Sequence, residues 1–253
     1  MGLFGSKKNP EDMKYDAISM MEKNQPKAAI SLFNKILKQN PEDIDVLLNK
    51  GIALNKIRKY SDAITCFDKI LEINPKEAQA LNNKGIAMAE NGNIQAASEC
   101  YDMAIEANPK YAASYFNKGV LLDKLQEHEE ALIILEKAIS VDSRKPNAMV
   151  YKGIVLGKMK KHEEALNCFQ NICKKYPNNQ DAFFQKGVQL AELGRHEKAL
   201  DVFDEILKKY KDNVNVIYAK SRSKAALEEY PEALELLKQA ISRNPKIIRT
   251  WAK

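Results

Sequence analysis

The sequence predicts an all-α solenoid built of stacked antiparallel helix pairs. The first observation is a period of 34 residues: the sextet NKGIAL at residues 49–54 returns in closely related form every 34 residues. The second is that small residues recur at fixed positions of this period, and the third is a proline near its end. Such a period is typical of repeat architectures, in which stacked neighbours complete a core that one helix pair cannot bury alone.

The period is numbered so that its recurrent glycine lies at position 8. Position 20 is alanine in all seven repeats, position 24 is large and apolar, and position 32 is proline in five. The predicted repeats are 10–43, 44–77, 78–111, 112–145, 146–179, 180–213 and 214–247. Residues 1–9 are expected to be a flexible segment. Residues 248–253 place Trp251 at position 4 of an eighth repeat, so they are expected to begin a further helix that is cut short.

Each repeat is predicted to contain two helices. Positions 4, 7, 8 and 11 share one helical stripe, and positions 20, 24 and 27 share another, with a polar break such as ENGN between them. Proline at position 32 cannot continue the second helix and is expected to end it. Glycine inside a helix costs about 1 kcal/mol relative to alanine. Its recurrence at position 8 therefore indicates a steric requirement, which we expect to be a close approach of two helix backbones.

These residues resemble the tetratricopeptide repeat family over residues 10–247. The resemblance implies a right-handed superhelix whose first helices, here called A helices, line a concave groove, while the second, or B, helices lie outside. The family's tryptophan at position 4 is absent, and position 7, usually leucine, is lysine in six repeats. We expect the lysine stems to lie along apolar surface while their ammonium groups reach water.

The chain carries few signs of catalytic or metal chemistry. His128, His162 and His196 all lie at position 17 of different repeats, too far apart for one metal ion to join. No phosphate-binding loop, GxSxG elbow or CxxC pair is present. We therefore expect no enzyme activity, no metal site and no cofactor. The four cysteines are interpreted as reduced thiols of a cytoplasmic protein.

A membrane partner is not expected. The start MGLFGSKK has no apolar signal segment, and no run approaches the ~18 apolar residues of a membrane helix. It does fit the N-myristoylation pattern, with Gly2 as the acceptor. A single acyl chain binds membranes only marginally. The oligomeric state is not determined by the sequence.

The resemblance implies that ligands contact positions 2, 5, 6, 9, 12 and 13 of the A helices. Position 6 is asparagine in three consecutive repeats, and an asparagine amide can pair with a peptide backbone through its donor and acceptor. Rungs ~10 Å apart would hold an extended peptide about every third residue. The candidate contacts are Asn49, Asn82, Asn83, Phe116, Asn117, Tyr151, Phe184 and Gln185, with Lys56, Lys124, Lys158 and Arg222 as candidates to meet an acidic ligand.

We therefore expect a non-enzymatic protein–protein interaction scaffold that binds an extended peptide or a partner helix, acidic ones included, in the concave groove. An alternative is a substrate-presenting or regulatory arm of a larger enzyme such as a glycosyltransferase, in which case the sequence would continue past Lys253. Nucleic acid is a weaker alternative, because the A-helix positions are the more basic part of each repeat but aromatic residues among them are sparse.

Overall fold

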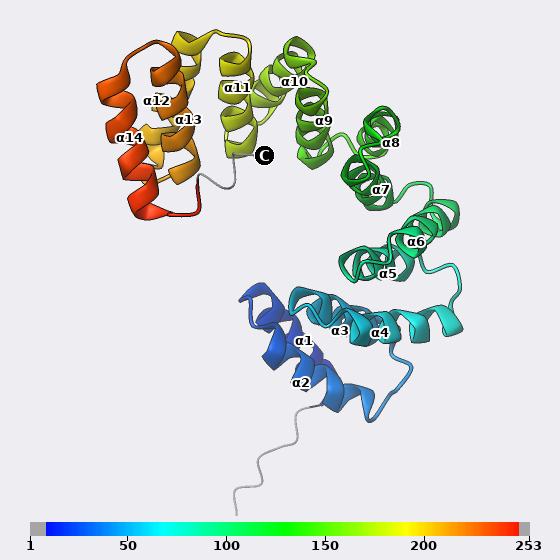
Figure 1. Ribbon diagram of the computed structural model, residues 1–253. Helices are drawn as coiled ribbons and strands as arrows, with labels where there is room; N and C mark the ends of the chain where they lie inside the picture. Colours follow the sequence, from blue (N-terminus) through cyan, green and yellow to red (C-terminus); the bar gives the residue numbers. More distant parts are fainter. Residues whose placement is uncertain (1–8, 248–253) are drawn as a thin grey trace, which may run out of the picture. The chain divides into compact units, whose positions relative to one another are not determined.

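The computed structural model describes residues 9–247, so the predictions of a flexible start and of a further helix at residues 248–253 concern residues that lie largely or wholly outside it. The described residues form fourteen α-helices and contain no strand. The chain divides into two units, residues 1–126 and 127–253, and each unit is described by itself (Figure 1).

The helices have nearly equal lengths and follow one another at regular intervals. The helices of the first unit are α1 Pro10–Glu22, α2 Pro26–Leu37, α3 Ile44–Lys56, α4 Tyr60–Ile73, α5 Ala78–Glu90, α6 Ile94–Ala107 and α7 Ala112–Lys124. Those of the second unit are α8 His128–Val141, α9 Asn147–Lys158, α10 His162–Lys175, α11 Gln180–Glu192, α12 His196–Lys209, α13 Val214–Ala226 and α14 Tyr230–Arg243.

Within each unit, every helix packs against the next one along the chain (Figure 1). The odd-numbered helices, which are the A helices, also touch one another in succession: α1, α3, α5 and α7 in the first unit, and α9, α11 and α13 in the second. The A helices of each unit thus form a continuous layer. The predicted all-α helical repeat fold is confirmed.

Each A helix ends in a left-handed residue at position 15. After α3, for example, the Arg58 N–H donates to the Asn55 carbonyl at 3.0 Å and the Lys59 N–H donates to the Leu54 carbonyl at 2.9 Å. This is the Schellman pattern of helix ends. The residues with positive φ are Asn24, Arg58, Gly92, Gln126, Lys160, Gly194 and Glu228. Because only two of them are glycine, the composition of the polar breaks does not reveal their common geometry.

Glycine at position 8 makes room for the ring at position 24 of the same repeat. A Cβ built on Gly51 would lie 2.4 Å from Cε1 of Phe67, whose ring is fully buried. The corresponding distance is 2.6 Å for Gly85 and Tyr101. The sequence predicted a close approach of two helix backbones at this position; at Gly51 the three nearest atoms all belong to the Phe67 ring. Gly153 and Gly187 likewise face Phe169 and Phe203.

Most of the lysines at position 7 form ion pairs in addition to reaching water. Among the described residues, four of the six form ion pairs with an acid at position 25 of the preceding repeat, and their side chains are only 20–28% exposed. The pairs are Lys84–Asp68 at 2.7 Å, Lys152–Glu136 at 2.8 Å, Lys118–Asp102 and Lys220–Asp204. The A helix of one repeat is thereby tied to the B helix before it. Asn34 and Gln170 stand where the acid would face Lys50 and Lys186.

We predict that Gly51→Ala destabilises the protein although alanine is the better helix former. The added methyl would overlap the buried Phe67 ring, and overpacking costs about 1–3 kcal/mol, against a gain of about 1 kcal/mol from helix propensity. The expected result is a net loss of up to about 2 kcal/mol in the free energy of unfolding, measured by urea titration.

Phe67→Leu is the matched control for this substitution. We expect Phe67→Leu to cost less in the Gly51→Ala background than in the wild-type protein, because the smaller side chain relieves the overlap. Additive effects of the two substitutions would contradict the assignment of the clash to this ring.

We predict that Asn34→Asp completes the ion-pair series at Lys50. Both residues line the same cavity between α2, α3 and α4, so a carboxylate at position 34 can approach the lysine. A double-mutant cycle with Lys50→Met should give a favourable coupling of about 0.2–1 kcal/mol, which weakens in high salt. A zero coupling at low salt would show that the two positions do not meet.

Candidate functional site

Asn49 and Asn83 occupy equivalent places on α3 and α5, both of them partly exposed. The Asn49 amide Nδ2 donates to the carbonyl of Asp45 at 2.8 Å, and Asn83 Nδ2 donates to the carbonyl of Gln79 at 2.8 Å. Each side chain is thus held by its own helix, four residues back. Because an amide carries two N–H donors and a carbonyl acceptor, this bond leaves a donor and an acceptor for another molecule.

The third asparagine of the series is held differently. On α7, the Asn117 Nδ2 donates to Asn82 Oδ1 of α5 at 2.9 Å, and Asn82 is only 3% exposed. Asn82 was expected to contact a ligand, but its burial makes it a positioning residue for Asn117 instead. A residue that the sequence analysis missed, Asn55, also fastens two A helices, because its Nδ2 donates to the Asn83 carbonyl at 3.3 Å.

The aromatic residues predicted to contact a ligand are partly buried rather than fully exposed to solvent. Phe184 on α11 packs against Phe203, with ring centroids 6.2 Å apart and ring planes at 43°. It therefore contributes to the core of the second unit, as one edge of an interior cluster. Phe116 on α7, Tyr151 on α9 and Gln185 on α11 are also of intermediate exposure.

The candidate cations Lys124 and Arg222 each have an acidic neighbour on the A helix of the preceding repeat. Lys124 Nζ lies 3.3 Å from Glu90 Oε1 of the preceding repeat. Arg222 Nη2 lies 3.7 Å from Glu192 Oε1. Together with the pairs at position 7, these contacts offset much of the positive charge that the sequence assigns to the A helices. The other two candidate cations, Lys56 and Lys158, are exposed.

The second unit has a cavity of about 240 Å³ between α11, α12 and α13. Its walls include Arg222, His196 and Ser223. Arg222 was predicted as a ligand contact, whereas His196 and Ser223 were not. The sequence signal that could have found them is the change at position 10 from Gln189 to Ser223, while position 17 of the preceding repeat is histidine in both cases, His162 and His196.

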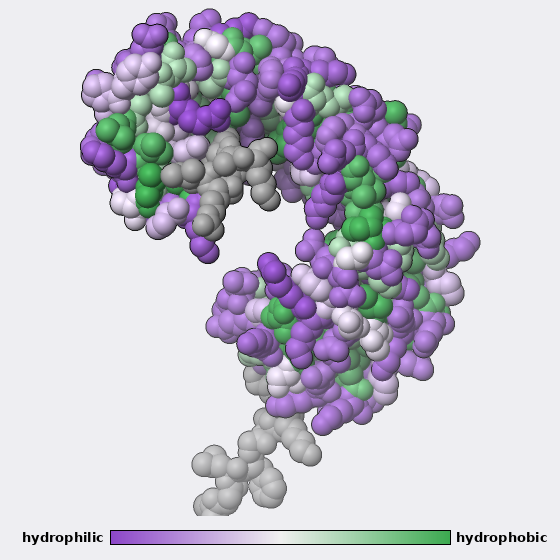
Figure 2. Space-filling model, in the orientation of Figure 1, coloured by the Kyte–Doolittle hydropathy of each residue, from purple (hydrophilic) through white to green (hydrophobic). Residues whose placement is uncertain are grey.

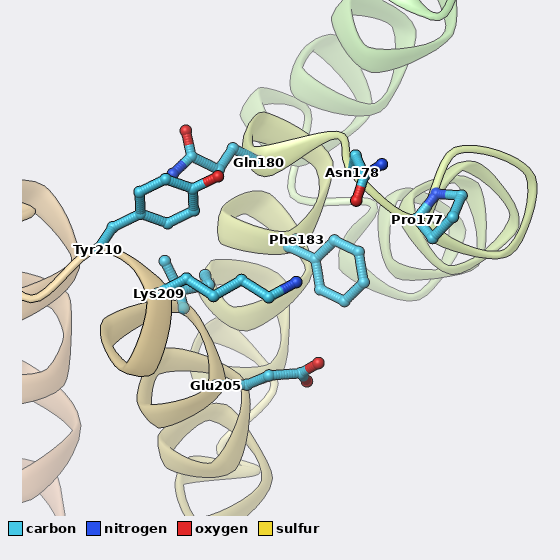
Figure 3. Close-up of a pocket in the computed structure, with 8 residues that line it drawn as sticks. Pro177, Asn178, Gln180, Phe183, Glu205, Lys209 and Tyr210 are labelled. Carbon is cyan, nitrogen blue, oxygen red and sulfur yellow. The ribbon is translucent and has the colours of Figure 1, made fainter.

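A smaller cavity lies beside the loop between α10 and α11. Figure 3 shows the Lys209 side chain extending from α12 toward the Phe183 ring, with Tyr210 and Gln180 at the other end. Its volume is about 50 Å³. Ligand pockets commonly measure ~300–1,000 Å³, so this space is too small for more than a few water molecules.

Among residues 9–247, no group of three or more histidine, cysteine, aspartate or glutamate side chains could hold a metal ion. All four cysteines are free thiols. Burial raises the pKa of Cys66, and the nearby Lys50 and Lys69 offset only part of this effect. Burial is also the main cause of the raised pKa of the other thiols, Cys100, Cys168 and Cys173.

The visible surface of both units is mostly hydrophilic, with hydrophobic residues in small patches (Figure 2). Within the described residues, no helix combines the length and the apolar character that a membrane crossing needs.

Comparisons with protein families give repeat matches along most of the chain. The family model of the Psidin N-terminal TPR repeats region matches residues 15–120. Three tetratricopeptide repeat models match residues 112–145, 152–214 and 190–251. The search of curated proteins found no match.

Solved structures with the same fold are numerous. A tetratricopeptide repeat protein from Parabacteroides merdae ATCC 43184 is 17% identical with a TM-score of 0.71, over 95% of this chain and 96% of its own. YrrB, described as a TPR protein with an unusual peptide-binding site, is 26% identical with a TM-score of 0.57, over 72% of this chain and 94% of its own. A chain of the APC/C hetero-tetramer Cut9–Hcn1 is 19% identical with a TM-score of 0.72, over 93% of this chain and 48% of its own.

We predict that the thiols of the folded protein react slowly at pH 8. The thiolate is the reactive form, and burial both raises the thiol pKa and limits access to the sulfur. Alkylation by iodoacetamide should be slower than in the urea-unfolded protein by about an order of magnitude or more. Equal rates in the two states would contradict the burial of these side chains.

The same shifts have a consequence for stability. Because the folded-state thiol pKa is raised, its contribution to stability is fully present below the ordinary value of 9.0 and is lost as the pH rises above it. The midpoint temperature of thermal unfolding should therefore decrease as the pH is raised from 8 to 10. This decrease should be less steep in a Cys66→Ala/Cys100→Ala variant.

Proposed function

We propose that this chain, which belongs to the tetratricopeptide repeat family, binds an extended peptide segment of a partner protein on the face formed by its A helices. A protein-interaction scaffold is the general role that the repeats and the similar structures support. The proposal goes further in naming an extended peptide as the ligand and the A-helix face as its site. We also propose that this chain does not itself catalyse a reaction.

The observation that carries the proposal is the matched pair Asn49 and Asn83. Both amides are held by a carbonyl of their own helix at 2.8 Å, so the two side chains have the same geometry in adjacent repeats. The helices that carry them, α3 and α5, are in contact. Two preorganised amides at one repeat spacing match the periodic donors and acceptors of an extended backbone, and preorganisation lowers the entropy cost of binding.

Two further observations support a peptide rather than a highly charged partner. The ion pairs of Lys124 and Arg222 reduce the net charge of the A-helix face, so acidity is a secondary feature of the partner. The similar protein YrrB is described as having a peptide-binding site. Long-range charge attraction is also screened within ~8 Å at physiological salt, whereas amide contacts are not.

We predict that Asn49→Ala/Asn83→Ala weakens binding of a peptide selected from a random dodecapeptide display library. Losing two backbone contacts of about 1 kcal/mol each should raise the Kd about tenfold or more, as measured by fluorescence anisotropy. Asn117 is left unchanged, because its removal would strand the buried Asn82 oxygen and confuse binding with stability.

The matched control is Asn34→Ala/Asn171→Ala, which removes two exposed asparagines from the B helices α2 and α10. This variant should bind the peptide with unchanged affinity, and both variants should keep the helical circular dichroism of the wild type. Selection of no peptide, or equal affinity of all three proteins, would overturn the proposal. Tight binding of single-stranded RNA or DNA with a steep salt dependence would instead favour a nucleic-acid partner.

A further inference from the structure

Two successive repeats of the second unit carry the same histidine in different surroundings. His162, at the start of α10, has its Nδ1 2.9 Å from Oε1 of Gln189 on α11. One repeat later His196 stands at the start of α12, and the position equivalent to Gln189 holds Ser223 on α13. The serine side chain is a single methylene with a hydroxyl, and it has no carboxamide. It therefore lacks the group that contacts His162 Nδ1.

The neighbouring small residue changes together with the glutamine. A Cβ built on Gly157 would lie 2.9 Å from Nε2 of Gln189, so the Gln189 amide lies directly over this glycine. The equivalent position one repeat later is Ala191. Glycine and glutamine at one junction between repeats are thus replaced by alanine and serine at the next junction, where the described residues supply no amide to His196 Nδ1.

This exchange leaves two buried polar atoms unsatisfied. His196 Nδ1 and Ser223 Oγ are buried and have no hydrogen-bond partner among the described residues. Ser223 is only 1% exposed. Most buried polar atoms in proteins are hydrogen-bonded, and an unsatisfied one calls for an explanation. The nearby Ser221 follows the common pattern, because its hydroxyl donates to the Tyr218 carbonyl at 2.8 Å.

Both residues line the cavity of about 240 Å³ between α11, α12 and α13. Its remaining walls are largely apolar, with Val188 and Ala219 among them. Arg222 and Glu192 also line it, and their charges offset each other across 3.7 Å. The cavity is therefore lined by apolar side chains, by the two residues that carry the buried unsatisfied atoms, and by a charged pair without net charge.

We propose that this cavity binds the side-chain amide of a glutamine or asparagine in the partner peptide. The inference rests on the proposed function for its source of ligand, but the cavity can be tested without it. A ligand amide would supply the group that Gln189 supplies to His162 one repeat earlier. An amide both donates and accepts, so it satisfies His196 Nδ1 in either tautomer and the Ser223 hydroxyl in either role. A carboxylate only accepts, so it could bond the two atoms only where both of them donate.

The direct test uses N-acetylglutamine amide as the probe. Titration should shift the ¹⁵N resonance of His196 Nδ1 in saturable fashion, while His162, already paired with Gln189, serves as the internal reference and stays unchanged. N-acetylnorleucine amide has the same backbone amides and an apolar side chain, and it should bind about tenfold more weakly. N-acetylglutamate amide should also bind more weakly at pH 7.

Ala191→Gly/Ser223→Gln recreates the arrangement of Gly157 and Gln189 beside His196. This variant should abolish the response of His196 to the probe. The converse variant, Gly157→Ala/Gln189→Ser, should open a second site and make His162 respond. If the filled variant does not fold, Ser223→Ala keeps the shape of the cavity and removes only the hydroxyl. It should weaken probe binding about threefold to tenfold.

Equal shifts with the glutamine and norleucine probes, or no shift with any probe, would overturn the inference and leave water as the partner of both atoms. Stronger binding of the glutamate probe would overturn the choice of an amide. If the Asn49→Ala/Asn83→Ala variant binds the selected peptide more weakly but no probe shifts His196, the cavity is rejected as a site and the proposed function is retained. If the glutamine probe shifts His196 but the variant binds the peptide as tightly as the wild type, only the peptide site in the first unit is rejected.

Discussion

The fold depends on the contact between a residue with no side chain and a buried ring sixteen positions later in the same repeat. At Gly51 even one methyl group would overlap the Phe67 ring, so the two helices of this repeat have one permitted spacing. Protein interiors are packed too tightly to absorb such an overlap without movement. Because the same contact recurs at Gly85, Gly153 and Gly187, one local constraint repeated along the chain sets the distance between helices and, with it, the face that the A helices present.

A second set of contacts links one repeat to the next. The ion pairs between position 7 and position 25, such as Lys84 with Asp68, join an A helix to the preceding B helix at the edge of the core. Partly exposed pairs of this kind contribute little stability, but opposite charges opposed at each junction disfavour a shifted register. They also bear on the proposed function. Lysines that count as basic groups in the sequence are paired with acids in the structure, which favours hydrogen bonding over charge as the proposed means of recognition.

The proposed recognition sites depend on how individual repeats agree or differ. Asn49 and Asn83 form a matched pair because their repeats agree, while Asn117 is bound to Asn82 and cannot play the same part. In the second unit, the replacement of Gln189 by Ser223 leaves buried polar atoms beside a cavity that the preceding repeat fills with its own side chain. A regular scaffold can thus acquire a site by the loss of an internal contact, since the scaffold around it is held by other residues.

The sequence by itself determined the period, the two helices of each repeat and the small residues of the core, because these follow from spacing along one helix and from residue size. It also identified Asn49, Asn83 and Arg222 as residues of the A-helix face. Only the tertiary structure decided that Asn82 is buried, that Phe184 joins the core, that position 15 is left-handed in residues as unlike as Arg58 and Glu228, and that His196 lacks the partner that His162 has. The left-handed residues end each A helix through local backbone hydrogen bonds. The other features depend on which side chains of neighbouring helices meet, and contacts between residues 16 to 35 positions apart are fixed by packing rather than by any local preference of the chain.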